Sequence, residues 1–231
     1  MARHLDLEEQ EQLDELKHFW KQYGNLITWV LIIGLGAIAA WNGWNWWQRS
    51  QAAQAAVLYD EVERAGEFGD AQRVERAFND VREKYGRTTY AQQAGLLAAK
   101  ILYEKGKADP AKAAFTWVAE NGQDEGYQAV ARLRLAGVLA DAKAYDDALK
   151  QLSAEMPAEF APLAADRRGD IYQLQGKKAE AKAEYIKAWQ GLDERQEYRR
   201  LVEVKLTALG VDPQSLKAGA PAAGASQAAK S

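Results

Sequence analysis

The longest apolar segment of the chain lies near its N-terminus. Residues 22–48 contain no Asp, Glu, Lys, Arg or His, and Leu26–Ala40 reads LITWVLIIGLGAIAA. At about 1.5 Å per residue, a helix from Tyr23 to Trp46 is about 35 Å long, which is enough to cross a hydrocarbon core of about 30 Å. The pattern therefore predicts a single transmembrane helix over residues 25–47.

Aromatic residues flank this segment on both sides, as expected where rings lie at the level of lipid headgroups. They are Phe19, Trp20 and Tyr23 before it, and Trp41, Trp44, Trp46 and Trp47 at its end. A buried core helix is one alternative, although its apolar stretch would be shorter. A cleaved signal peptide is another, because Ala37-Ile38-Ala39 resembles a cleavage site, but the leader before it is long and acidic. We therefore expect an uncleaved anchor in the lipid bilayer.

The N-terminal tail, residues 1–24, carries its own helical pattern. Its large apolar residues recur at helical spacing and predict a short amphipathic helix; they are Leu13, Leu16, Trp20 and Tyr23. A frayed tail is the alternative, and Gly24-Asn25 is expected to break the helix before the span. Within fifteen residues of the span, Lys17 and Lys21 precede it, whereas only Arg49 follows it. This imbalance predicts a cytoplasmic N-terminus and an exported, periplasmic C-terminal part.

Beyond the span, the sequence is helical in character and repeats itself. Ala, Leu, Gln, Glu, Lys and Arg dominate, without alternating Val, Ile and Thr, which indicates an all-α fold. Segments 133–152 and 166–185 match at an offset of 33 residues, with small residues and Leu or aromatic residues in equivalent places. The matched pairs are Ala136 and Gly169, Leu139 and Tyr172, Ala148 and Ala181, and Leu152 and Tyr185. This pattern of helical hairpins resembles the tetratricopeptide repeat.

Two further hairpins precede this pair, and one helix follows it. Segment 99–118 repeats the pattern, and 48–65 with 71–85 is a more divergent first pair. We expect a tetratricopeptide-like α-hairpin solenoid over residues 48–212, closed by a C-terminal capping helix at 193–209. The low-complexity segment 213–231, which begins after Asp212, is expected to be disordered.

Composition and charge exclude several classes of function. The 231 residues include 30 Lys and Arg against 33 Asp and Glu, which argues against a nucleic-acid partner. There is no Cys, and both histidines, His4 and His18, lie in the first eighteen residues. Acidic pairs such as Asp146-Asp147 lie among lysines, as on a solvated helix face. We expect a protein that is not an enzyme and that holds no cofactor and no metal.

Two surfaces are candidates for binding other proteins. Solenoids usually bind polypeptides on the concave face formed by the first helix of each hairpin. Spacing from the small residues predicts seven positions there: Leu96, Lys100, Tyr103, Leu133, Asp166, Asp170 and Gln173. In the span, the small residues Gly36, Ala40 and Gly43 allow another membrane helix to approach closely. Ordinary exposed positions, and the general abundance of glycine in membrane helices, are the alternatives.

Several segments together resemble the family of ancillary SecYEG translocon subunits (YfgM-like proteins). They are QLDELKHFWKQYGN (12–25), the Gly-containing span ending in Trp, RLRLAGVLADAKAYDDAL (132–149) and DRRGDIYQLQGKKAEAKAEYIKAW (166–189). The resemblance covers nearly the whole chain except the last twenty or so residues. It implies a single-pass bacterial inner-membrane protein that associates with the SecYEG translocon and a PpiD-like periplasmic chaperone and assists exported polypeptides. It supplies no catalytic residues and no binding motif.

Two other functions are compatible with parts of this pattern. An envelope scaffold for cell division or wall synthesis could be built on the same repeats. A membrane-tethered hydrolase would need a nucleophile that the sequence does not show. A non-enzymatic adaptor at the export channel is therefore the leading hypothesis.

Overall fold

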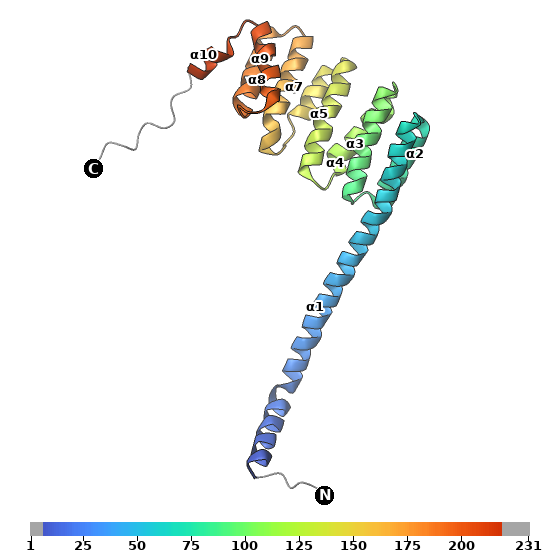
Figure 1. Cartoon of the computed structure of the whole chain (residues 1–231), viewed down its shortest axis with the longest axis vertical. Helices are drawn as coiled ribbons and strands as arrows, with labels where there is room; N and C mark the ends of the chain where they lie inside the picture. Colours follow the sequence, from blue (N-terminus) through green and yellow to red (C-terminus); the bar gives the residue numbers. More distant parts are fainter. Residues whose placement is uncertain (1–6, 219–231) are drawn as a thin grey trace, which may run out of the picture. The chain divides into compact units, whose positions relative to one another are not determined.

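The computed structural model describes residues 7–218, and all regular structure in this part of the chain is helical (Figure 1). The prediction of an all-α fold is therefore confirmed. The chain forms two compact units, with the boundary between Ala53 and Gln54 inside the first helix. The elements are α1 (Leu7–Glu67), α2 (Ala71–Tyr85), α3 (Thr89–Glu104), α4 (Ala108–Asn121), α5 (Glu125–Asp141), α6 (Tyr145–Leu152), the 3₁₀ turn η1 (Ala158–Phe160), α7 (Ala161–Leu174), α8 (Lys178–Gly191), α9 (Glu197–Ala208) and α10 (Pro213–Ala218).

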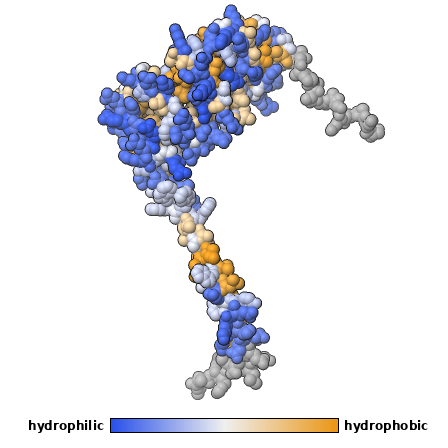
Figure 2. All heavy atoms as spheres, turned by 180° about the vertical axis from the view of Figure 1, so that it is seen from behind, coloured by the Kyte–Doolittle hydropathy of each residue, from blue (hydrophilic) through white to orange (hydrophobic). Residues whose placement is uncertain are grey.

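The first unit consists of the N-terminal part of α1, whose apolar side chains are not covered by protein. One segment of the described chain, within Gln12–Glu67, is long and apolar enough to cross a membrane. Only 6% of its most apolar 18-residue stretch is buried by the rest of the protein. Trp29, Ile33 and Trp41 are each more than half exposed. Figure 2 shows a hydrophobic band, coloured orange, part of the way along α1. Such a surface is stable in hydrocarbon and costly in water.

The expected break at Gly24-Asn25 is wrong, because α1 continues through both residues. Gly24 lies under the indole of Trp20, where a Cβ atom would be 3.1 Å from Nε1 of that ring. The Thr28 hydroxyl donates a hydrogen bond of 2.7 Å to the Gly24 carbonyl. Side chains four residues apart on one helix face each other. These contacts support the helix at a residue that would otherwise weaken it.

The second unit is a row of helical hairpins that begins with the last residues of α1 and continues through α9 (Figure 1). The small residues predicted at the helix crossings are fully buried. Ala99, Ala136, Ala148 and Ala181 have no exposed surface. Gly169 is also a close crossing, since a Cβ atom there would lie 2.5 Å from Cδ1 of Tyr185. The predicted hairpin packing is therefore confirmed at side-chain level.

The turns within the hairpins repeat with the same offsets as the side chains. Gly106 and Gly176 have positive φ angles of 72° and 74°. Lys143 occupies the equivalent position between α5 and α6, with φ of 62°. Glycine adopts this left-handed conformation without steric cost, whereas a lysine is strained. The repeat is thus visible in the backbone as well as in the core.

The C-terminal end differs in part from expectation. The predicted terminal helix is α9, and its Val202 and Leu206 are fully buried against α8. The prediction of disorder from residue 213 is wrong for Pro213–Ala218, which form α10. Proline fits the first position of a helix, and Leu216 packs against the α8–α9 core, which explains why this short helix forms. The rest of the predicted tail, 219–231, lies outside the described residues.

Candidate functional site

A cavity of about 540 Å³ lies between the first helices of two successive hairpins, α3 and α5. Phe115 of α4 and Arg167 of α7 also contribute to its walls. We call this cavity the α3–α5 groove. Four of the seven predicted face residues line it: Leu96, Lys100, Tyr103 and Leu133. These four predicted positions therefore lie together on one groove formed by α3 and α5.

The floor of the groove is mostly apolar. Leu96, Leu97 and Leu133 are partly buried and pack on the main core. Gly137 also lines the groove, and beyond its own stretch of helix backbone no heavy atom of the described residues lies within 4 Å of the place where its Cβ would be. The floor is consequently open above the α5 backbone at this residue, where a bound segment can approach closely.

Hydrogen bonds between α3 and α5 mark two levels of the groove. Nε2 of Gln93 donates to the Tyr127 hydroxyl at 2.7 Å. Ten residues along α3, or about 15 Å, the Tyr103 hydroxyl donates to the Asp141 carboxylate. This hydrogen bond, with burial and the negative charge of Asp141, raises the pKa of Tyr103, so its hydroxyl remains a donor. The two bridges give the groove a defined length.

Three cations line the groove, and they differ in how far they are already paired. Nζ of Lys100 lies 3.9 Å from the Glu104 carboxylate. Arg167 lies 3.7 Å from the Asp170 carboxylate, which is too long for a hydrogen bond. Arg134 is exposed and has no hydrogen bond or ion pair with any described residue. The guanidinium groups therefore keep most of their donors free.

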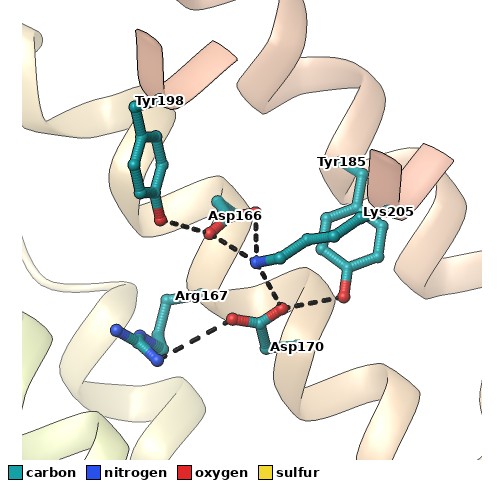
Figure 3. A network of polar contacts seen from close by, with 6 residues as sticks. All are labelled: Asp166, Arg167, Asp170, Tyr185, Tyr198 and Lys205. Atoms are coloured by element: carbon teal, nitrogen blue, oxygen red, sulfur yellow. Dashed lines mark hydrogen bonds and ion pairs between the residues drawn. The ribbon is translucent and has the colours of Figure 1, made fainter. Parts of the chain in front are cut away.

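Asp166 and Asp170 were also predicted on the partner-binding face, but they belong to a network inside the domain (Figure 3). Nζ of Lys205, from α9, lies 2.8 Å from both Asp166 oxygens and 2.7 Å from Asp170. Tyr198 donates to Asp166 at 2.6 Å, and Tyr185 donates to Asp170 at 2.8 Å. Asp166 is only 1% exposed. Its expected role as an open contact residue is therefore wrong, because α9 covers it.

Burial is the main cause that raises the pKa of both tyrosines in this network, followed by their hydrogen bonds to the carboxylates. Tyr185 and Tyr198 therefore stay protonated and donate to Asp170 and Asp166. The arrangement joins α7, α8 and α9 and is structural. Gln173, the last predicted face residue, is exposed and does not line the α3–α5 groove.

Several groove residues were not among the predicted positions. They are chiefly Gln93, Tyr127, Arg134, Gly137 and Asp141. The repeat offsets contained a signal for two of them. Arg134 and Arg167 are 33 residues apart, and Gly137 is equivalent to Lys100 and Asp170 at offsets of 37 and 33. The bridging pairs had no such signal, because they depend on which side chains meet across two helices.

The small residues proposed for a membrane contact lie on the uncovered surface of α1. Gly36, Ala40 and Gly43 are all exposed. In the part of the chain that the structure describes, no heavy atom outside the neighbouring helix backbone lies within 4 Å of a Cβ placed at Gly36 or Gly43. This face is sterically open to another helix.

Comparisons with known proteins are consistent along most of the chain. The tetratricopeptide repeat-like domain family matches residues 17–211. A protein of Neisseria gonorrhoeae named ancillary SecYEG translocon subunit is 34% identical over 90% of this chain and 100% of its own length. Proteins of the same name from Haemophilus influenzae and Escherichia coli are 29% and 27% identical, over 80% and 79% of this chain and 90% and 85% of their own lengths. The similarity includes the span and the repeats together.

Proposed function

Because the chain belongs to the family of ancillary SecYEG translocon subunits, we propose that it is a non-enzymatic inner-membrane adaptor. It associates with the SecYEG translocon and a PpiD-like periplasmic chaperone, and it assists the folding or handover of exported polypeptides. The observation that carries this proposal is one chain with both an uncovered apolar helix and an open apolar groove between repeats.

The groove is the proposed contact site for polypeptides. Binding sites for other molecules are concave and lined mainly by apolar side chains. Leu96 and Leu133 form part of the partly buried apolar floor of the groove, and the open floor at Gly137 admits another chain. Segments leaving a translocon are unfolded and expose apolar side chains, which this floor would cover.

The apolar helix is the proposed attachment to the membrane and the translocon. The excess of Lys17 and Lys21 over Arg49 supports a cytoplasmic N-terminus and a periplasmic repeat domain. Gly36, Ala40 and Gly43 are the proposed contact with a neighbouring membrane helix, since small residues allow close packing in lipid.

Site-specific photocrosslinking in intact cells tests this proposal. A photoreactive residue replacing Leu133 should crosslink to exported polypeptides or to the chaperone, whereas one replacing Lys182, on the exposed face of α8, should not. Gly137→Leu should abolish the Leu133 crosslinks, because its side chain fills the groove without meeting any described heavy atom within 4 Å of its Cβ.

Purification in mild detergent should also recover SecY. Failure to recover SecY and the chaperone, under conditions that preserve the translocon, would refute the proposal.

A further inference from the structure

We propose that the α3–α5 groove selects polypeptide segments in which an acidic side chain lies beside apolar side chains, and that Arg134 pairs with the acid. This inference rests on the proposed use of the groove and names the class of segment that it takes. Three observations carry it: the distribution of charge in the groove, the apolar floor, and the way α9 covers the equivalent positions in the last repeat.

The charges in the groove are not evenly mixed. Both acidic residues, Glu104 and Asp141, are in the last positions of their helices, and Asp141 already accepts a hydrogen bond from Tyr103. Arg134 lies seven residues before Asp141, about 10 Å along α5, and has no partner among the described residues. An incoming carboxylate would therefore find a free guanidinium in the middle of the groove. A cationic side chain at the same place would be repelled.

Arg167 adds a second cation to the same groove. It is the equivalent of Arg134 in the next repeat, at an offset of 33 residues, and it also lines the cavity. Its nearest acidic partner, Asp170, is held at 2.7 Å by Lys205 and at 2.8 Å by Tyr185. Lys205 and Tyr185 thus contact the Asp170 carboxylate more closely than Arg167 does, at 3.7 Å. Planar guanidinium groups suit carboxylates because they offer paired donors.

The chain itself contains an example of how this face is complemented. Asp166 and Asp170 of α7 are equivalent to Leu96 and Lys100 of α3 and to Leu133 and Gly137 of α5. Over α7, Lys205 of α9 supplies the opposite charge within 2.8 Å. Over α3 and α5 the equivalent carboxylates are replaced by leucines, a lysine and a glycine. A segment that complements the groove over α3 and α5 must therefore carry an acidic side chain where α9 carries Lys205, and apolar side chains that cover the leucines.

The groove length limits the occupant to a short segment. The distance of about 15 Å between the Gln93 and Tyr103 levels corresponds to about ten residues of helix, or four to five residues of extended chain. A carboxylate near the centre of such a segment would reach Arg134, while its neighbours cover the leucine floor.

Fluorescence anisotropy with the full-length protein in phosphatidylcholine nanodiscs tests this selection. The probes are three fluorescein-labelled peptides, Leu-Ala-Ser-Leu-X-Leu-Ser-Ala-Leu-Gly, with Glu, Gln or Lys at X. We expect the Glu peptide to bind about fivefold more tightly than the Gln peptide, and the Lys peptide to bind most weakly. Arg134→Gln should remove the preference for the Glu peptide over the Gln peptide. Arg200→Gln, on an exposed position of α9 outside the groove, is the matched control and should keep the preference.

The outcomes separate this inference from the proposed function. Equal binding of the three peptides, or a Glu preference that persists in Arg134→Gln, would overturn the acidic selection. If Gly137→Leu still blocked binding and crosslinking in that case, the proposed use of the groove would stand. Binding of none of the peptides would also overturn the selection, and the crosslinks at Leu133 would then decide separately whether the groove contacts other polypeptides.

Discussion

Gly137 and Gly169 lie on the first helices of successive hairpins but have opposite surroundings. A Cβ at Gly137 would meet no described heavy atom within 4 Å apart from its own helix backbone, whereas one at Gly169 would lie 2.5 Å from both Cδ1 and Cε1 of Tyr185. Glycine weakens a helix interior unless packing requires it. The requirement is steric at Gly169, while at Gly137 the absent side chain leaves the groove open.

Alanine substitutions at these two glycines should therefore change stability in opposite directions. We expect Gly169→Ala to lower the free energy of unfolding by about 1–3 kcal/mol, because the buried Tyr185 ring must shift. Gly137→Ala should raise it by about 0.5–1 kcal/mol, because the helix gains propensity without a clash. Urea unfolding of the full chain in detergent, followed by circular dichroism, measures both. Equal effects of the two substitutions would contradict the packing described for Gly169.

The tyrosine hydroxyl of Tyr198 gives the protein a specific sensitivity to alkaline pH. Burial and the hydrogen bond to Asp166 raise its pKa above the usual 10.0. Above about pH 10, the unfolded chain loses this proton while the folded chain retains it, so stability falls as pH rises. We expect the urea midpoint of Tyr198→Phe to decline less steeply between about pH 9 and pH 11 than that of the wild type.

Tyr90→Phe is the control for this titration. The Tyr90 hydroxyl makes no hydrogen bond with the described residues, so the wild-type slope should be retained. Identical slopes for the wild type and Tyr198→Phe would show that the Asp166 hydrogen bond does not govern the alkaline transition.

At the scale of elements, α9 is a cap held by charge as well as by apolar packing. Val202 and Leu206 are buried against α8. Lys205 extends from the same helix to the two carboxylates of α7. Burying charges is costly unless each is paired with good geometry. The cap is therefore specific to α7, since no other described helix presents this pair of acids to Lys205.

Removing Lys205 should consequently destabilise the last hairpin more than removing an exposed lysine. We expect Lys205→Met to lower the free energy of unfolding by about 3 kcal/mol, because Asp166 would remain buried without its cation. Lys182→Met, at an exposed position of α8, should have almost no effect. The double variant Asp166→Asn with Lys205→Met should recover part of the loss. Hydrogen exchange of α9 localises the change, and unaltered α9 protection in Lys205→Met would contradict the role of the network.

The elements that the sequence predicted correctly are the hairpin helices, which are determined by the spacing of small and large residues along each hairpin. A small residue at Ala136 or Gly169 recurs because each helix crossing has the same geometry, so one hairpin predicts the next. The predicted break at Gly24-Asn25 was wrong, because Trp20 and Thr28 support the helix there. Helix α10 was not predicted, because its formation depends on the packing of Leu216 against residues distant in the sequence.

The candidate site could be predicted only in part for a related reason. Leu96 and Leu133 follow from the repeat, since the repeat fixes which positions face the groove. Whether such a position is open depends on what the next helix places over it. At α7 the next helix supplies Lys205 and covers Asp166, whereas over α3 and α5 nothing in the described chain fills the space. Spacing within one hairpin contains no information on that difference.

At the scale of the whole molecule, the proposed function depends on which side of the membrane each terminus occupies. Within fifteen residues of the span, Lys17 and Lys21 before it oppose only Arg49 after it, so the positive-inside bias is small. We expect a C-terminal alkaline phosphatase fusion to be active and a C-terminal green fluorescent protein fusion to be dark in the wild type. The double substitution Lys17→Gln with Lys21→Gln should give a mixed population of both orientations, because the bias then reverses by one charge. Arg49→Gln should keep the wild-type orientation, since it only increases the bias. If the phosphatase fusion of the wild type were inactive and its green fluorescent protein fusion fluorescent, the groove would lie in the cytoplasm. That result would rule out every periplasmic partner proposed for it.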